Sequence, residues 1–268
     1  MIRPGAIGDF IVSIPAMESL RDGFLEVWCA GQNVPLAGFA GEARSIASTG
    51  LDLFGLPGRE PPPGLLTRLR GFDRIASWYG ANREEFVQAL RQLGIPTAFR
   101  RALPPGGASS HAVDYYIDQV ADLARTTPPR VPRIAVKSHA RRGTVLIHPF
   151  AASPAKRWPL ELFRKAARML ATDYPVEWTA GPEERLDEAV RFDNLLDLAQ
   201  WLAGACVFVG NDSGISHLAA AVGTPVVALF GPTDPSIWAP RGPAVRVLRP
   251  LNSLTPEDVV SAVRSLCR

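Results

Sequence analysis

The stretch that most constrains the fold of this chain covers residues 205–231. It begins with an unbroken apolar run, residues 205–209, of the kind found in a strand that is buried on both faces. A segment of small residues follows and stops at residues 223–225 (Gly-Thr-Pro), which are typical of the end of a helix. A second apolar run, residues 226–231, comes directly after. This order predicts a strand, a helix and a second parallel strand, and therefore a parallel sheet.

The turn between this first strand and its helix is a candidate anion site. Asp212, Ser213 and Gly214 leave the strand and open the helix. The free backbone N–H groups and the positive end of the helix dipole favour an anion there, phosphate above all. His217 lies one turn further on and can add a proton or a hydrogen bond to the same anion. The alternative is that Asp212 or Ser213 only caps the helix and that His217 is an ordinary surface residue.

A second loop of this kind lies at the start of the chain. Gly5 and Gly8 enclose a tight connection, Asp9 follows, and residues 11–21 have the apolar spacing of a helix. Only residues 1–3 precede the loop, whereas a typical strand has about five residues. Either the chain starts late or the sheet has a very short strand at its centre. The glycines do not fit the Gly-x-Gly-x-x-Gly dinucleotide pattern, so we do not predict an NAD site.

Strands and helices alternate through the rest of the chain, which predicts two doubly wound α/β domains. Further strands are expected at residues 25–29, 72–78, 98–100, 144–148 and 176–180. Helices are expected at residues 34–39, 43–48, 83–93, 112–123, 159–170 and 197–203, and directly after residues 181–184.

A stretch rich in proline, residues 126–132, is the best domain boundary because such stretches form stiff, exposed connections. We therefore expect an N-terminal domain at residues 1–125, a linker at 126–142 and a C-terminal domain at 143–268. The last helix, residues 255–267, has a good N-terminal signal and is free to pack back on the N-terminal domain.

The composition is that of an ordinary soluble protein, with 47% hydrophobic and 21% charged residues. No apolar stretch reaches the ~18 residues of a spanning helix, and no signal peptide is recognisable. Cys29, Cys206 and Cys267 have no metal-like spacing, and their odd number suits a reducing cytoplasm better than a disulfide framework. The net charge of +3 is a weak signal for an anionic acceptor or a membrane surface, and we expect no nucleic-acid partner.

Four fragments together resemble glycosyltransferase family 9, the heptosyltransferases that build the inner core of lipopolysaccharide. They are residues 3–9, 156–159 and 181–185, and the long fragment 211–217 with its continuation 230–235. The resemblance implies a GT-B architecture, in which two Rossmann-like domains face a cleft, here with a shortened N-terminal domain. It also implies a cytoplasmic enzyme, either soluble or bound peripherally to the inner membrane. Such an enzyme transfers heptose from an ADP-activated donor with inversion at the anomeric centre, and we expect it to need no cofactor.

The resemblance assigns the donor to the second domain. Asp212, Ser213, Gly214 and His217 would hold the diphosphate, and Lys156 would share it. Ser153 lies on the same loop as Lys156 and offers a further hydrogen bond. The alternative for Lys156 is a solvated loop lysine. Trp158 is expected to pack rather than to contact the ligand.

Two acids at a strand end, Glu183 and Glu184, suit a ribose hydroxyl, although they are equally consistent with the acidic start of a helix.

The resemblance and its position assign Asp9 as the general base, which takes the proton of the acceptor hydroxyl. The alternative, a helix N-cap, does not exclude that role. Gly8 and Arg83 are assigned to the acceptor side. The four histidines are scattered, so we expect no metal site and metal-independent transfer. The rival hypotheses are a non-catalytic or differently specific GT-B protein that binds a nucleotide-sugar and, more remotely, a nicotinamide oxidoreductase.

Overall fold

The computed structural model describes residues 1–137 and 143–267. The chain divides into two compact units. The N-terminal unit comprises residues 1–108 and 115–128, and the C-terminal unit comprises residues 109–114 and those from 129 onward. Part of the expected linker, residues 138–142, lies outside the described residues.

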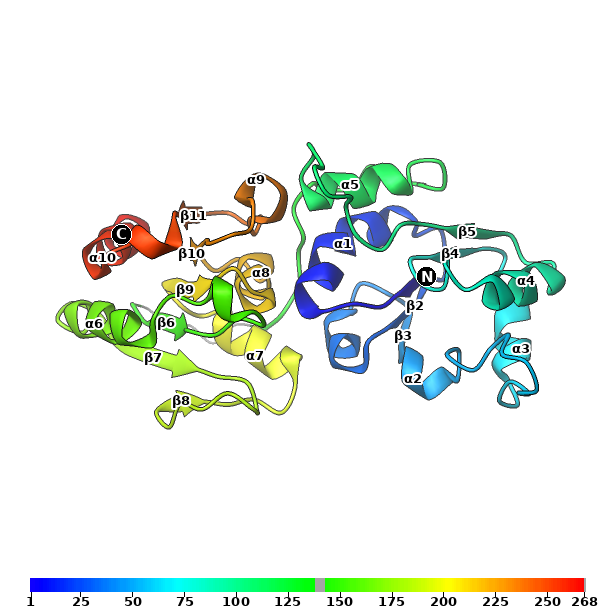
Figure 1. Cartoon of the computed structure of the whole chain (residues 1–268), viewed down its shortest axis with the longest axis horizontal. Coiled ribbons are helices and arrows are strands. Elements are labelled where there is room, and N and C mark those ends of the chain that lie inside the picture. The colour runs from blue at the N-terminus through cyan, green and yellow to red at the C-terminus, as the bar shows by residue number, and fades with distance from the viewer. Residues whose placement is uncertain (138–142, 268) are drawn as a thin grey trace. The chain divides into compact units, whose positions relative to one another are not determined.

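The N-terminal unit contains a parallel sheet with the strand order β3-β2-β1-β4-β5 (Figure 1). Its strands are β1 (Ile2–Arg3), β2 (Glu26–Cys29), β3 (Glu42–Ser45), β4 (Ile75–Ser77) and β5 (Thr97–Phe99). Its helices are α1 (Ile7–Ser19), η1 (Gly31–Leu36), α2 (Ile46–Thr49), α3 (Leu65–Arg70), α4 (Glu84–Gln92) and α5 (Ala112–Gln119), the last shared with the other unit.

The first strand is a two-residue stub at the centre of this sheet. Ile2 lies opposite Trp28 of β2 on one side and Ser77 of β4 on the other. Ile2 and Arg3 are both buried, so a short strand suffices to join the two halves of the sheet. The very short central strand, one of the two alternatives that the sequence left open, is therefore present.

The expected helix at residues 43–48 is wrong in its first half. Residues 42–45 form the edge strand β3, which pairs in parallel with β2, and only the single turn α2 follows. Arg44 Nε lies 3.2 Å from Oε1 of the buried Glu26 on β2. This ion pair and the strand pairing outweigh the local preference of the segment.

The C-terminal unit contains a parallel sheet with the order β11-β10-β9-β6-β7-β8 (Figure 1). Its strands are β6 (Val145–His148), β7 (Val176–Thr179), β8 (Ala189–Val190), β9 (Val207–Asn211), β10 (Val226–Leu229) and β11 (Val245–Leu248). Its helices are η2 (Pro154–Lys156), α6 (Leu160–Leu170), α7 (Leu195–Leu202), α8 (Gly214–Ala221), α9 (Pro235–Trp238), η3 (Leu251–Ser253) and α10 (Pro256–Leu266).

The chain order of these strands reverses between β6 and β9. From β6 the chain first adds β7 and β8 on one side, and then β9, β10 and β11 on the other. The loops after β6 and β9 therefore diverge at the carboxyl edge of the sheet, and α/β proteins bind ligands in the crevice at such a switch point.

The expected helix after residues 181–184 is also wrong, because this segment turns and continues into β8. β8 pairs with β7. Arg191 Nη2 donates hydrogen bonds to the carbonyl oxygens of Glu184 (2.7 Å) and Leu186 (3.1 Å). In a helix these carbonyl oxygens would accept from backbone N–H groups, so their bonds to Arg191 stabilise the turn instead.

The last helix, α10, packs against α6 within the C-terminal unit (Figure 1). Val259 and Val263 of α10 are buried in the same core as Phe163 and Leu170 of α6. The apolar face of α10 thus belongs to the C-terminal core, and packing of this helix on the N-terminal domain stays a prediction.

The cysteines also differ from expectation. Cys206 and Cys267 are joined by a disulfide that connects the start of β9 to the end of α10. Their Cα atoms are 5.6 Å apart, within the normal range for such a bond. Because 61 residues separate the two cysteines, no rule based on cysteine spacing predicts this disulfide from the sequence. Of the helices that the structure describes, none has the length and hydropathy required to span a membrane.

Candidate functional site

Asn211, the last residue of β9, organises the loop that follows β6. Its fully buried side chain donates from Nδ2 to the carbonyl oxygen of Pro149 (2.8 Å) and accepts at Oδ1 from the backbone N–H of Trp158 (2.9 Å). Both ends of the loop are therefore tied to the end of β9. In the sequence Asn211 is only the first residue of the fragment 211–217, and an amide directly after the apolar run is the signal that indicates such a role.

The tied loop brings Lys156 to the residue after Asn211. Lys156 Nζ lies 2.7 Å from Asp212 Oδ2. The Asp212 side chain is only 7% exposed, whereas that of Lys156 is 31% exposed. The lysine therefore keeps an open side toward a ligand, and it is no freely solvated loop residue.

The amino end of α8 begins directly after this ion pair. Ser213 is the N-cap residue, but its side chain makes no capping hydrogen bond, and its Oγ is buried with no partner among the described residues. Asp212 uses its carboxylate for Lys156 instead. Simple helix capping by either side chain, the alternative above, is therefore wrong. The helix end keeps its donors and its positive potential for an anion.

His217 is buried one turn into α8, so it is no ordinary surface residue. Burial lowers the pKa of its imidazole to about 4, with Lys156 and His111 acting in the same direction and Asp212 in the opposite one. The ring is therefore neutral at pH 7 and offers a hydrogen bond rather than a positive charge.

His111 joins this region from a distant part of the sequence. Its Nε2 is 2.9 Å from the carbonyl oxygen of Ala239, and its Nδ1 accepts from the N–H of Val113. Burial lowers the pKa of His111 as well. No local pattern in the sequence indicates this contribution.

Two adjacent acids follow β7 in the next loop. The Glu184 side chain is fixed by hydrogen bonds, whereas Glu183 is exposed. Glu184 Oε2 accepts from the N–H of Gly181 (2.6 Å) and from His148 Nε2 (3.1 Å). Burial would raise the pKa of Glu184, but these bonds outweigh it and hold the pKa below its ordinary value. A fixed carboxylate thus stands at the carboxyl end of β7.

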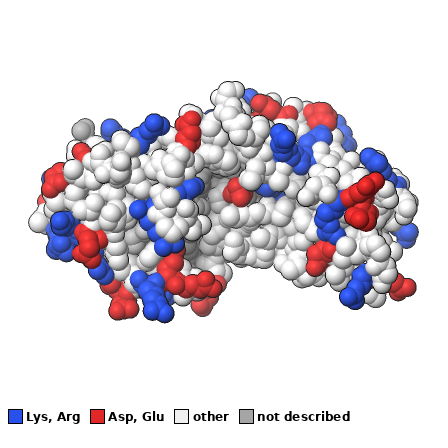
Figure 2. Space-filling model, in the orientation of Figure 1, with Lys and Arg blue, Asp and Glu red and all other residues white. Residues whose placement is uncertain are grey.

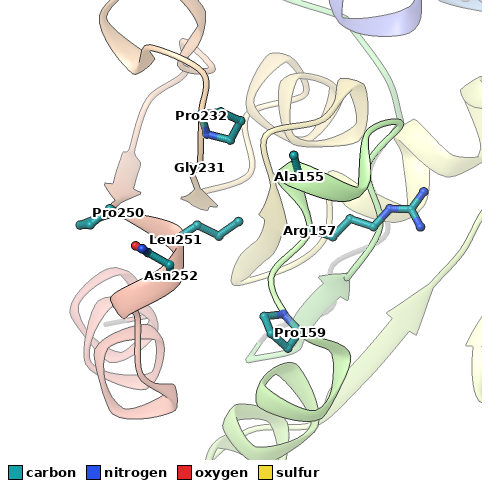
Figure 3. Close-up of a pocket in the computed structure, with 8 residues that line it drawn as sticks. All are labelled: Ala155, Arg157, Pro159, Gly231, Pro232, Pro250, Leu251 and Asn252. Carbon is teal, nitrogen blue, oxygen red and sulfur yellow. The ribbon is translucent and has the colours of Figure 1, made fainter.

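The other donor-side residue, Ser153, is exposed at the start of η2 and shares the tied loop with Lys156. Near that loop, a pocket of about 490 Å³ opens between η2, the end of β10 and η3 (Figure 3). The Arg157 side chain points away from it and donates to the carbonyl oxygen of Ala151. The pocket wall is mainly apolar and lacks Lys156 and Asp212, so the charged cluster lies outside it.

In the N-terminal unit, Asp9 lies in the first turn of α1, whose N-cap is Ala6. Asp9 is therefore not the N-cap, although its Oδ2 accepts from the N–H of Ala6 at 3.3 Å. Its neighbour Gly8 lies in the same turn. Asp9 is only partly buried, so its carboxylate remains accessible.

Arg83 lies at the N-cap of α4 and is firmly held. It donates from Nη1 to the Tyr79 hydroxyl (2.7 Å) and from Nη2 to the carbonyl oxygen of Asp52 (3.1 Å). On the face drawn in Figure 2, basic and acidic side chains are mixed over both units, in agreement with the small net charge.

Two parallel doubly wound sheets are the architecture of the GT-B class of glycosyltransferase folds. The structure of Escherichia coli ADP-heptose lipopolysaccharide heptosyltransferase II is similar over 99% of this chain and 97% of that chain, with a TM-score of 0.76 and 21% identity. An E. coli heptosyltransferase solved with ADP gives a TM-score of 0.73 at 17% identity, covering 98% of each chain. A dodecameric, iron-containing E. coli glycosyltransferase gives 0.55 at 17% identity, covering 91% of this chain and 60% of that one.

The chain belongs to glycosyltransferase family 9 (heptosyltransferase), whose sequence profile matches residues 107–260, more than half of the chain. Lipooligosaccharide heptosyltransferase 2 of Haemophilus influenzae is 36% identical over 114 residues, which cover 36% of this chain. Lipopolysaccharide heptosyltransferase 3 of E. coli is 30% identical over 155 residues, which cover 52% of this chain. These alignments span 33% and 44% of the two relatives, less than half of each.

Proposed function

We propose that this protein is an inverting glycosyltransferase that moves a heptose from ADP-heptose to a lipopolysaccharide-type acceptor. The observation that carries the proposal is the ion pair of Lys156 and Asp212 beside the uncapped amino end of α8, at the sheet switch point. Relatives named as heptosyltransferases, and a similar fold solved with ADP, support this choice of donor.

In the proposed donor complex, the diphosphate rests against the N–H groups at the start of α8, at Ser213 and Gly214. Lys156 turns part of its ion pairing from Asp212 to the phosphate, and Ser153 adds a hydrogen bond from the same loop. The neutral His217 ring adds another, which suits a phosphate oxygen already facing a cation.

The ribose of the nucleotide is proposed to bind at the end of β7, where Glu183 and Glu184 lie. Glu184 is the better placed of the two because His148 and the Gly181 N–H already hold its carboxylate. A carboxylate in a fixed orientation accepts hydrogen bonds from ribose hydroxyls at little further entropic cost.

The proposed reaction is a single displacement. The acceptor hydroxyl oxygen attacks the anomeric carbon of the heptose while Asp9 takes the hydroxyl proton. The bond from the anomeric carbon to the diphosphate oxygen breaks, and ADP leaves with the electron pair. Lys156 and the end of α8 stabilise the charge that develops on the leaving diphosphate.

The positive charge for this step comes from the protein, which supports transfer without a metal ion or another cofactor. Because one similar structure contains iron, the point is tested directly. Treatment with EDTA followed by gel filtration should leave the rate unchanged, and restoration of lost activity by added iron or magnesium would contradict metal independence.

The acceptor side is assigned to Gly8, Asp9 and Arg83 of the N-terminal unit. Arg83 is fixed by Tyr79 and by the Asp52 carbonyl, so its guanidinium presents a rigid cation to an anionic sugar. The enzyme is proposed to act at the cytoplasmic face of the inner membrane, as a soluble or peripherally bound protein with no nucleic-acid partner.

The proposal is tested by transfer assays with ADP-heptose, ADP-glucose and UDP-glucose on a lipopolysaccharide-core acceptor, with the product anomer assigned by NMR. Asp9→Asn should lower the rate by about 10²- to 10⁴-fold while ADP still binds. Asp118→Asn, a change of an exposed acid in the same unit, is the matched control and should be neutral. Parental turnover by Asp9→Asn would contradict the base, and preference for a UDP-sugar would contradict the donor. ADP-sugar binding without any turnover would favour the non-catalytic alternative.

A further inference from the structure

We propose that Arg3 and Asn33 are positioning residues that hold the Asp9 carboxylate in place through the backbone of the loop before α1. This inference rests on the proposed function, in which Asp9 takes the acceptor proton. Neither residue would touch a substrate, because both are buried.

Arg3 is the last residue of the central stub strand, and it is 1% exposed. Its guanidinium reaches back to the loop that leaves the strand. Nη2 donates to the carbonyl oxygen of Asp9 (2.8 Å) and Nη1 to that of Pro4 (3.0 Å). Nε donates to the hydroxyl of Ser13, one turn further along α1 (3.0 Å). The planar guanidinium of Arg3 therefore connects the start of the loop to the first two turns of the helix by hydrogen bonds.

Aromatic rings fix the guanidinium from the other side. Its central carbon lies 4.7 Å from the centre of the Tyr116 ring and 5.7 Å from that of Trp78. The Tyr116 hydroxyl donates to the carbonyl oxygen of Ala102, which also lies 3.5 Å from Arg3 Nη1. These contacts leave the guanidinium little freedom to move.

Arg3 takes part in none of the ion pairs found among the described residues. Among the described residues no carboxylate lies within ion-pair distance of Arg3, although the charge of Asp9 attracts it from further away. Burying such a cation is costly, and a well-packed apolar side chain would fill this position at lower cost. What distinguishes Arg3 from such a side chain is its set of bonds to the Asp9 loop. The contacts therefore favour a role in placing that loop.

Asn33, in η1 after β2, holds the middle of the same loop. Its Nδ2 donates to the carbonyl oxygen of Gly5 at 3.2 Å, and its Oδ1 has no partner among the described residues. Gly5 has a φ of +120°, and a Cβ there would lie 3.1 Å from the Cβ of Asp9. The loop thus folds tightly onto Asp9, and Asn33 fixes that turn.

Asp9 itself has only a weak local restraint, the 3.3 Å bond from the N–H of Ala6. The direction of its carboxylate therefore depends on how the loop enters α1, which Arg3 and Asn33 determine. Small displacements matter for such a group, because a shift of about 1 Å in a reacting group can lower a rate by about 10²-fold.

The test is a double-mutant cycle on kcat with the full-length protein, ADP-heptose and a lipopolysaccharide-core acceptor. Arg3→Lys keeps the positive charge but removes the planar guanidinium and its set of hydrogen bonds. It should therefore lower kcat by about 10- to 100-fold. The KM for the donor and the Kd for ADP should stay within about twofold, because the donor groups are in the other unit. Arg68→Lys, in α3, where the side chain pairs with Glu26 at the start of β2, is the matched control and should leave kcat unchanged.

When Arg3→Lys is introduced into the Asp9→Asn variant, kcat should fall by less than about twofold further, because the effect of Arg3 on the reaction passes through Asp9. An equal loss in both backgrounds would overturn the inference and show a general structural effect. If Arg3→Lys fails to fold, Asn33→Ser carries the same cycle.

The two proposals fail differently. A parental kcat for Arg3→Lys and Asn33→Ser, with Asp9→Asn inactive, would overturn the positioning role alone. A parental kcat for Asp9→Asn would overturn the general base and the positioning role together.

Discussion

Lys156 and Asp212 are separated by 56 residues in the sequence, and their Nζ and Oδ2 atoms lie 2.7 Å apart. The pair holds a partly exposed cation next to the free amino end of α8. In the ligand-free protein Asp212 stabilises that cation, and a phosphate would compete for it. We therefore expect the arrangement to be stable without a ligand and still to bind an anion.

Replacing Lys156 by alanine should weaken ADP binding by about 10- to 100-fold, the effect of one charge-assisted hydrogen bond. Isothermal titration measures this directly. Lys165→Ala, which removes an exposed lysine of α6, is the matched control and should leave the Kd unchanged. Equal affinity in both variants would mean that the diphosphate binds elsewhere.

Replacing Asn211 by alanine should destabilise the C-terminal unit by about 2–4 kcal/mol, because the Pro149 carbonyl and the Trp158 N–H lose their buried partner. The freed loop should also bind ADP less tightly, since it carries Lys156. Denaturant unfolding followed by tryptophan fluorescence checks the first effect and titration the second. Asn252→Ala, at an exposed amide, is the control. An unchanged unfolding midpoint would contradict the role of Asn211.

Stability should depend on the titration of His217. Its pKa is about 4 in the folded protein, against 6.5 for an unperturbed histidine, so the unfolded chain binds more protons between these values. Stability should therefore be full above about pH 6.5 and fall by up to about 3 kcal/mol as the pH approaches 4. His217→Gln should lose this part of the pH dependence. A parental pH profile for the variant would show that His217 is not the group responsible.

The disulfide between Cys206 and Cys267 should appear as a mass two units lower in the non-reduced, denatured protein. Closing a loop of 61 residues should stabilise the fold by about 4 kcal/mol, so a reductant should lower the melting temperature. Cys206→Ser should melt at one temperature with or without reductant. A full set of free thiols after purification without reductant would contradict the bond.

Patterns that depend on burial could be read from the sequence. Residues 205–231 form β9, α8 and β10 as predicted, because an apolar run buried on both faces leaves few other solutions. The short strand before Gly5 is a stub at the centre of its sheet, one of the two expected solutions. Trp158 packs in the C-terminal core, also as expected.

Features that depend on long-range partners could not be read in this way. β8 replaces an expected helix because Arg191 and β7 supply its partners. The contribution of His111 to the surroundings of His217 comes from a segment more than 100 residues away. Asn211 and Arg3 bond mainly to backbone carbonyls and N–H groups. Nearly every residue carries these groups, so the sequence does not show which of them will be the partners.

The most direct test of the account is a crystal structure of the protein with ADP. We expect the diphosphate within hydrogen-bond distance of the Gly214 N–H and of Lys156 Nζ, with the bond from Lys156 to Asp212 lengthened. A nucleotide bound at another place, with the start of α8 unchanged or covered by protein, would contradict the account.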